Sequence, residues 1–339
     1  MSWGPPRHIP ILLAIDCEPD PRMPPPGSNL PWAGLAATLA EVEDWRQAMV
    51  ARWRHPVTVN WFWRLDPQIE TLHGRDDWGL VAHGAMIEAT ARAGDPHGLH
   101  PHATRWDAAC QAWCNDHGNW PWIERLTRRA VAGYRDYFGR PPESFRFGDC
   151  WLSAELLALA ERLGLRHDLT LTADQPPQPS LNGREWSTGA LPDRRGAPFL
   201  PFRRDPDRFL RAAPGRREGL WLFPSVSGAP QLPPGGYGRR AWLRSRLRGQ
   251  AWPRPPLDLE QRVANLGGPP ERFKPVFENG LAKAGFRYAL VALRSDAAGQ
   301  RPTGLRNVRQ NLKLLLNHQW SPRFRLVSPG GALDLLGLS

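Results

Sequence analysis

The chain has 339 residues, is 41% apolar and carries a formal net charge of +11. This apolar content is enough for a hydrophobic core, and the absence of any run of about 18 apolar residues excludes a transmembrane helix. The first residues, MSWGPPRHIP, do not have the pattern of a signal peptide, so a cytoplasmic location is expected.

The first half of the chain alternates between two kinds of hydrophobic pattern. Alternating strands and helices predict a mainly parallel sheet, either open or closed into a barrel. Gly164 is expected to end the last of these helices. The predicted strands are 11–15, 56–63 and 144–148, and the predicted helices are 35–54, 78–93, 106–137 and 153–163.

The pattern breaks down between residues 172 and 275, where proline, glycine and arginine are frequent. We interpret this stretch as an irregular insertion, or a set of elaborated loops, within a single domain that spans residues 1–339. Brief strand signals occur at 219–226. Regular patterns then return, and they predict a helix at 276–284, a strand at 287–293, a helix at 308–316 and a short strand at 324–328 before a final helical turn.

The positive charge and the cysteines point to no particular partner. Basic residues are spread along the chain, with dense runs at 203–217 and 239–248, and no RRM, zinc-finger or homeodomain pattern accompanies them. Nucleic acid is therefore not an expected partner. Cys110 and Cys114 are spaced for one face of a helix, and the lack of a CxxC pair argues against a zinc cluster or disulfide scaffold.

Unusual polar groups follow three of the predicted strands, in the segments DCEPD (16–20), HGLHPH (97–102) and RFGD (146–149). Active sites of parallel α/β proteins lie at the carboxyl ends of strands. A carboxylate with two imidazoles is a common ligand set for Zn²⁺ or a related metal, and a second carboxylate could accept a proton from metal-bound water. Taken singly, each group could instead belong to a turn or a solvated surface. Their occurrence at successive strand ends favours a functional site.

These segments resemble three motifs of the polysaccharide deacetylases of carbohydrate esterase family 4. LLAIDCEPD is similar to the strand that ends in acids, GDPHGLHPH to the motif with two metal-binding histidines, and SFRFGDCWLSAELLALAERLGLRHDLTL to the arginine-containing motif. The two histidines are two residues apart here instead of four. The resemblance covers residues 11–172 and returns weakly at 288–335. It implies a distorted (β/α) barrel, a divalent metal such as zinc, and hydrolysis of an acetamido group on a carbohydrate.

The resemblance also implies roles for particular residues. Asp16 would be the catalytic base, and Arg146 would hold it ionised. His100 and His102 would bind the metal. Either Glu18 or Asp20 would be the third ligand, and the sequence leaves that choice open.

One position departs from the family pattern. The segment YALVALRSD has Arg294 where the family has a histidine that protonates the leaving amine. An arginine is not a general acid near neutral pH. His97 could serve instead, the reaction could differ, or catalysis could be lost. Arg294 could then bind an anionic group of the ligand.

Three tryptophans near the predicted strand ends, Trp61, Trp106 and Trp151, are candidates for stacking on a sugar, although most tryptophans are part of a core.

Taken together, these features of the sequence favour a metal-dependent hydrolase that removes an acetyl group from an amino sugar or polysaccharide. The alternative is a catalytically inactive, deacetylase-like protein that binds a carbohydrate or a partner. The two differ in whether the acids of 16–18 and the histidines of 100–102 converge.

Overall fold

The computed structural model describes residues 7–28, 31–177, 188–228, 263–300 and 302–339. The basic run at 239–248, and parts of the predicted irregular region 172–275, lie outside these described residues.

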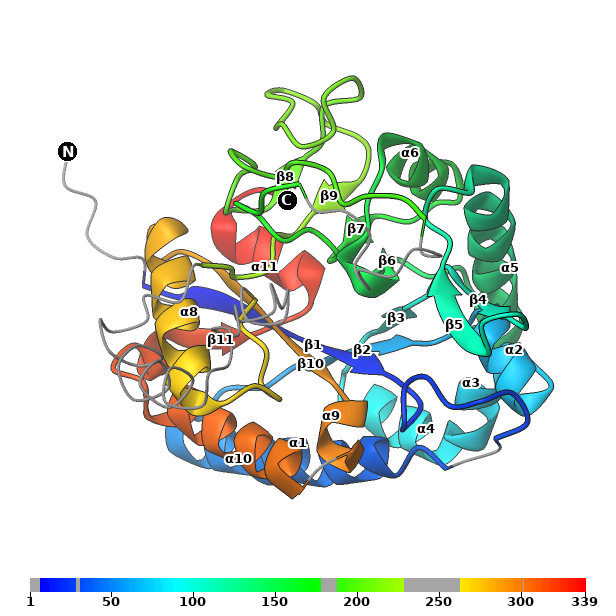
Figure 1. Ribbon diagram of the computed structural model, residues 1–339. Helices are drawn as coiled ribbons and strands as arrows, with labels where there is room; N and C mark the ends of the chain where they lie inside the picture. Colours follow the sequence, from blue (N-terminus) through cyan, green and yellow to red (C-terminus); the bar gives the residue numbers. More distant parts are fainter. Residues whose placement is uncertain (1–6, 29–30, 178–187, 229–262, 301) are drawn as a thin grey trace, which may run out of the picture.

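A curled sheet of nine strands lies at the centre of the fold (Figure 1), in the order β10-β1-β2-β3-β6-β7-β9-β8, with β11 also paired to β1. Every pairing in it is parallel except that of β8 with β9. Its strands are β1 (Ile9–Cys17), β2 (Asn60–Trp63), β3 (His97–Leu99), β6 (Ser144–Phe145), β7 (His167–Asp168), β8 (Phe202–Arg203), β9 (Trp221–Leu222), β10 (Ala289–Arg294) and β11 (Phe324–Leu326).

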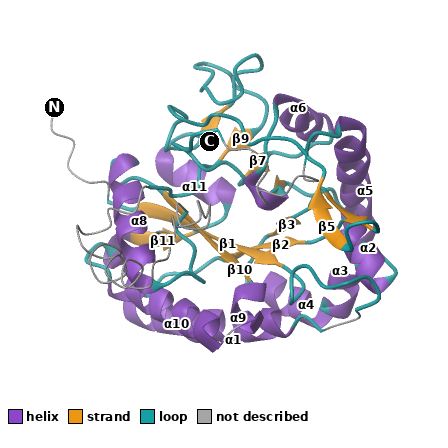
Figure 2. Ribbon diagram, in the orientation of Figure 1, coloured by secondary structure: helices purple, strands orange, loops and turns teal. Residues whose placement is uncertain are grey.

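Helices cover the outside of the curled sheet (Figure 2). This arrangement is the distorted (β/α) barrel that the sequence resemblance implied. None of the described helices is long and apolar enough to cross a lipid bilayer. The helices are α1 (Ala33–Trp53), α2 (Pro67–His73), α3 (Trp78–Ala82), α4 (Gly84–Arg92), α5 (Trp120–Phe138), α6 (Ala154–Arg162), α8 (Pro270–Lys283), α9 (Asp296–Gln300), α10 (Pro302–Asn317) and α11 (Pro329–Leu336), with 3-10 turns η1 (Gly148–Cys150) and η3 (Ser321–Arg323).

Strand β1 is buried along its whole length, as a nearly continuous apolar run predicts. Its side chains alternate between two hydrophobic clusters. Leu13 and Ile15 belong to the large cluster to which most of the helices contribute, whereas Leu12 and Ala14 belong to a smaller cluster contributed by several strands and by α11. Because side chains two residues apart share a face, Asp16 projects on the same side as Ala14. The acidic end of the strand is thereby turned towards the inside of the barrel.

The predicted helical segment 106–137 is wrong in its first part. Residues 104–115 form a hairpin of β4 (Thr104–Asp107) and β5 (Ala112–Asn115), and only α5 is helical. Asp107 accepts hydrogen bonds from two backbone N–H groups in the turn, and Trp106 packs across the hairpin on Trp113. The tight turn and the cross-strand pair override the helical spacing. As a result Cys110 is exposed in the turn and Cys114 lies in a strand.

The predicted irregular region contributes to the sheet where the structure describes it. It supplies β8 and β9, and a parallel bridge joins Thr172 to Ser225. Further bridges pair Ser227 with Val263 and Asn265 with Ala292 of β10. Isolated backbone pairs therefore carry the hydrogen bonding from the β9 side of the curl round to β10.

Asp168 is a fully buried acid at the end of β7. One of its carboxylate oxygens accepts the Thr170 N–H at 3.0 Å, and the other has no hydrogen-bond partner among the described residues. Burial raises the pKa of Asp168 from 3.8 to about 6, despite hydrogen bonds from Thr170 and the distant charges of Arg146 and Arg194. The charged form of this side chain is therefore unfavourable in the folded protein.

We expect Asp168→Asn to stabilise the protein above pH 6. Since the folded-state pKa is raised, the folded protein binds a proton more tightly than the unfolded chain, and the wild type loses stability as the pH rises from about 4 to about 6. The shift corresponds to about 3 kcal/mol at most. Urea unfolding from pH 4 to pH 8 should show variant and wild type converging at low pH and separating above pH 6. An equal difference at every pH would contradict this assignment.

Candidate active site

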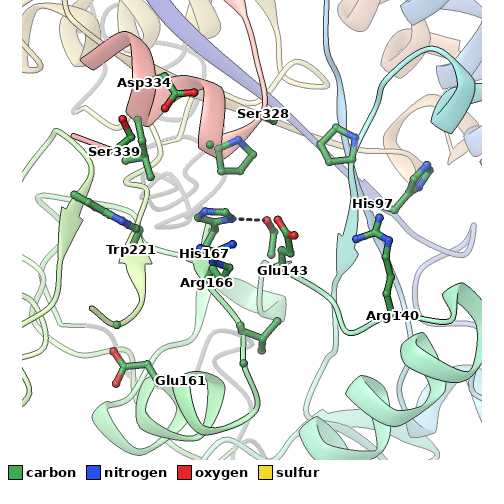
Figure 3. Close-up of a pocket in the computed structure, with 18 of the residues that line it drawn as sticks. His97, Arg140, Glu143, Glu161, Arg166, His167, Trp221, Ser328, Asp334 and Ser339 are labelled. Atoms are coloured by element: carbon green, nitrogen blue, oxygen red, sulfur yellow. Dashed lines mark hydrogen bonds between the residues drawn. The ribbon is translucent and has the colours of Figure 1, made fainter. Parts of the chain in front are cut away.

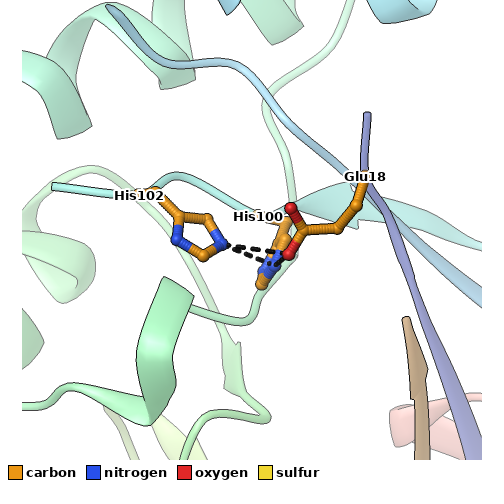
Figure 4. A group of neighbouring side chains, drawn as sticks. All are labelled: Glu18, His100 and His102. Atoms are coloured by element: carbon orange, nitrogen blue, oxygen red, sulfur yellow. Dashed lines mark hydrogen bonds and ion pairs between the residues drawn. The ribbon is translucent and has the colours of Figure 1, made fainter. Parts of the chain in front are cut away.

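Three side chains that sequence analysis singled out meet at one point (Figure 4). Glu18 Oε1 lies 3.2 Å from His100 Nε2 and 3.3 Å from His102 Nε2, and the two Nε2 atoms are 3.0 Å apart. All three residues are buried. Among the described residues, this is the group of histidine, cysteine and acidic side chains whose donor atoms could hold one metal ion.

The ends of three strands bring these residues together. Glu18 follows β1, and its backbone is fastened to the end of β10 because the Ser295 hydroxyl bonds to both its N–H, at 2.9 Å, and its carbonyl, at 3.2 Å. His100 follows β3, and its N–H donates to the Trp63 carbonyl of β2. His102 packs directly on Gly148, where any Cβ would overlap its ring. The glycine after β6 is thus what allows the imidazole to approach.

The tautomer of His100 follows from its surroundings. Its Nδ1 lies 2.6 Å from the Arg146 carbonyl, which can only accept a hydrogen bond. Nδ1 therefore carries the proton, and in the neutral ring Nε2 turns its lone pair towards Glu18. A carbonyl that fixes the far nitrogen in this way is the usual partner of a metal-binding histidine.

This donor set fits a divalent transition metal. Two imidazole nitrogens and a carboxylate oxygen that point at one another repel unless a cation or a proton lies among them. Ligands about 2.0–2.1 Å from a tetrahedral zinc ion are separated by about 3.3 Å, which is close to the spacings found here. Three protein ligands would leave a further position for water, as in catalytic sites.

Asp16 and Arg146 form a buried ion pair beside these donors. Arg146 Nε lies 2.9 Å and 3.1 Å from the two Asp16 oxygens, and its Nη1 donates to the Leu169 carbonyl at 2.7 Å. Asp16 Oδ1 is 3.8 Å from His100 Nδ1. Asp16 is only 2% exposed, and its side chain is held by these two contacts with the Arg146 guanidinium.

Arg22 and Asp149 border the cluster on the His102 side. Arg22 is paired with Asp149, and it lies 3.6 Å from Glu18 Oε1 and 3.1 Å from His102 Nδ1. Asp149 Oδ2 is 3.3 Å from the same nitrogen. Burial alone would raise the pKa of Asp149, but the positive charge of Arg22 and the contact with His102 hold it well below its usual range. The His102 ring therefore lies between an ionised carboxylate and the Arg22 guanidinium, which can only donate a hydrogen bond to Nδ1.

Asp149 owes its position to an unusual backbone. Its φ of 54° lies in the left-handed region, which aspartate tolerates better than most residues.

Glu18 is held ionised by neighbouring positive charges, as Asp149 is. Burial would raise the pKa of Glu18, but His102, Arg64 and Arg22 together keep it well below the usual range.

Asp20 is not part of the cluster. Its Oδ2 accepts the Gly34 N–H at 3.1 Å, so the carboxylate is used at the start of α1. The cis peptide bond between Asp20 and Pro21 lies in this same stretch of chain. Of the two acids left open by the sequence, the structure brings Glu18 to the histidines.

His97 is placed away from the cluster, contrary to its suggested role as a proton donor there. It lies at the start of β3, so the strand rise of about 3.3 Å per residue separates it from His100 by about 10 Å. Its Nδ1 accepts the Trp63 indole N–H at 2.9 Å. Burial lowers the pKa of His97 to about 4, and the ring is therefore neutral near pH 7.

The three tryptophans that were candidates for sugar stacking differ in how far they are buried. Trp61 is fully buried and donates to Asp95, so it cannot stack on a substrate. Trp151 is 6% exposed, and one face of its ring is covered by the stacked imidazole of His117. Trp106 is half-buried on the β4–β5 hairpin.

Arg294 is in register with Asp16 across the β1–β10 pairing. Its guanidinium forms an ion pair with Asp296 at 3.1 Å and is about one-quarter exposed. Part of its hydrogen-bonding capacity is therefore already used within the protein.

Several residues around the site were not identified from the sequence. Arg22, Arg64 and Ser295 contact Glu18. A signal was available for two of them. Arg22 lies four residues after Glu18, and Arg64 follows β2 on the face of Phe62.

A large cavity of about 1080 Å³ lies at the other end of the barrel (Figure 3). Its walls include the beginnings of β3, β6, β7 and β9, together with α11. His97, Arg166, His167 and Trp221 are among its lining residues, whereas Glu18, His100 and His102 are not. The cavity therefore belongs to the amino ends of the strands and is not a continuation of the candidate active site.

Neither a protein-family model nor a curated protein matches the sequence. Solved structures match it in fold. A Mycobacterium smegmatis protein assigned as a polysaccharide deacetylase superposes with a TM-score of 0.50 at 11% identity, over 99% of this chain and 93% of its own. A Parabacteroides distasonis protein assigned as a glycoside hydrolase/deacetylase gives 0.51 at 12% identity, over 98% and 73%. PuuE allantoinase gives 0.50 at 10% identity, over 100% and 95%. The chain therefore has a divergent form of the deacetylase-type fold.

Proposed function

We propose that this chain, which has the fold of the polysaccharide deacetylases, is a metal-dependent hydrolase that removes an acetyl group from an amino sugar or a polysaccharide. The observation that carries the proposal is the meeting of Glu18, His100 and His102 beside the buried Asp16–Arg146 pair. A ligand set and an ionised base at one strand-end site are what metal-assisted hydrolysis of an amide needs.

In this proposal Glu18, His100 and His102 would hold the metal, which we propose to be zinc. When bound, such an ion lowers the pKa of a water ligand and polarises an amide carbonyl. Asp16 accepts the proton of the attacking water, and Arg146 holds the carboxylate in place with both oxygens engaged. The Arg146 carbonyl fixes the His100 ring at the same time, so one residue orients both the base and a ligand.

The leaving nitrogen must receive a proton, and Arg294 cannot supply it because its guanidinium stays charged. His97 lies at the far end of β3 and cannot reach the site. We therefore propose that Asp16 delivers the proton it has taken from water to the nitrogen, acting first as base and then as acid. We also propose that Arg294, which is in register with Asp16 on the neighbouring strand, contacts an anionic group of the substrate.

The proposal is tested by the release of acetate. The purified protein, loaded in turn with Zn²⁺ and Co²⁺, is incubated with N-acetylglucosamine oligomers, peptidoglycan fragments and O-acetylated xylan. We expect equal amounts of acetate and free amine from the N-acetylated substrates, and loss of both with a chelator. Metal binding without acetate release from any acetamido sugar would contradict the proposed activity.

The alternative is a catalytically inactive protein that binds a carbohydrate or a partner. It is favoured by the arginine at position 294, where the resemblance implies a histidine acid. Calorimetric binding of the same oligomers, with no acetate released and no metal required, would support this second function.

A further inference from the structure

We infer that Arg64 and Asp66 are positioning residues that present a single oxygen of Glu18 to the metal and tie this ligand to His102. The inference rests on the proposed metal site and assigns a function to two buried residues that take no part in the proposed reaction itself.

Arg64 is a guanidinium with no exposure to solvent. Its Nη1 donates to Glu18 Oε2 at 2.6 Å, while Glu18 Oε1 faces the two histidine nitrogens. Its Nε and Nη2 donate to the two oxygens of Asp66 at 2.5 Å and 3.1 Å. One oxygen of Glu18 is thus engaged by a charge-assisted hydrogen bond, and the other faces the histidine nitrogens, with Arg22 3.6 Å away and no hydrogen bond between them.

Asp66 extends the same network to a second ligand. Its Oδ2 accepts the His102 backbone N–H at 3.1 Å. Its Oδ1 caps α2 by accepting the N–H groups of Gln68 and Ile69 at 3.0 Å and 3.3 Å. The carboxylate is therefore fixed by a helix end, and through it Arg64 and His102 are fixed relative to each other. Movement of Asp66 would displace ligands on both β1 and β3.

Arg64 and Asp66 are needed together because their charges balance. A guanidinium next to a carboxylate ligand would weaken the attraction of that ligand for a cation, since it shares the same negative charge. Asp66 balances the charge of Arg64 and leaves Glu18 with a net attraction for the metal. Side chains in such positions hold ligands in their binding geometry, and their loss costs metal affinity in other proteins.

The protein offers a matched control for this inference. Arg46 is also buried, and it donates to both oxygens of a buried acid, Asp95, at 3.0 Å and 2.5 Å. Asp95 precedes β3, at the opposite end of that strand from His100. Arg64→Lys and Arg46→Lys therefore remove the same planar fork from two buried pairs, and only the first pair contacts a metal ligand.

The test is the affinity of the full-length apoprotein for Zn²⁺, measured by competition with a chromophoric chelator, with thermal unfolding of each apoprotein alongside. We expect Arg64→Lys to weaken Zn²⁺ binding about 10- to 100-fold and Arg46→Lys to leave it unchanged. Co²⁺ bound to Arg64→Lys should show an altered visible spectrum. Equal affinities in Arg64→Lys, Arg46→Lys and wild type would overturn the inference but leave the proposed function standing. A wild type that binds neither metal would overturn both.

A second measurement uses only the wild type, so it does not depend on whether the Arg64→Lys variant folds. Difference infrared spectroscopy of wild type, with and without Zn²⁺, reports the splitting of the carboxylate stretches. We expect the wide splitting of a carboxylate bound through one oxygen. The narrow splitting of a carboxylate bound through both oxygens would show that Arg64 does not hold Oε2 and would overturn the inference.

Discussion

We expect replacement of both His100 and His102 with alanine to abolish metal binding. The wild type is expected to hold about one divalent ion per chain, because its three donor atoms lie within 3.0–3.3 Å of one another. The double variant leaves Glu18 as the one ligand, which is too few to retain the ion. Metal content after dialysis, measured by plasma mass spectrometry, should fall from about one ion per chain to near zero.

The control for this result is a second pair of buried histidines. His97 and His167 line the cavity at the opposite end of the barrel, and burial lowers the pKa of each to about 4. The double variant His97→Ala and His167→Ala should keep its metal. Full retention of metal by the His100/His102 variant would reject the site, and a wild type without metal would favour the inactive binding protein.

We expect Asp16→Asn to lose most of its turnover and to keep its metal. The amide has the shape of the carboxylate but cannot accept a proton from water, so we expect kcat to fall by about 10²- to 10⁴-fold. The variant also leaves the buried guanidinium of Arg146 without its anionic partner, which lowers stability. Acetate release and metal content, measured on the same folded samples, separate the two effects.

Two further substitutions make the test specific. Asp20→Asn should turn over at close to the wild-type rate, because the Asp20 carboxylate accepts the Gly34 N–H and is not part of the cluster. Glu18→Gln should weaken metal binding. If Asp16→Asn keeps nearly full activity, Asp16 is not the base. If instead Asp16→Asn loses metal and Glu18→Gln does not, the two roles are exchanged.

The framework of this protein follows from its amino-acid sequence. The apolar run of β1 specifies a strand buried on both faces, and alternation along it turns Asp16 to the inside. The alternation of strands and helices specifies a parallel sheet, whose carboxyl ends meet at one edge. Because of that shared edge, the sequence suffices to name the acids of 16–20, the histidines of 97–102 and Arg146 as candidates for one site.

Local sequence patterns gave wrong predictions where tertiary packing determines the secondary structure or the orientation of a side chain. Residues 104–115 have helical spacing but form a hairpin, because the Asp107 turn and the Trp106–Trp113 pair stabilise it. Trp61 lies on a strand near the site, yet its side chain faces the helices and is fully buried. Proximity along the chain does not indicate which face of a strand a side chain occupies when both faces are covered.

Tertiary packing selects the acid that joins the histidines and supplies the groups that hold it there. Glu18 and Asp20 are equivalent by spacing, but the Gly34 N–H engages Asp20, whereas Ser295 and Arg64 engage Glu18. These partners lie up to 277 residues away along the chain. Hydrogen bonds between such distant groups depend on how strands and loops pack in three dimensions, and a single sequence records the residues but not their pairing.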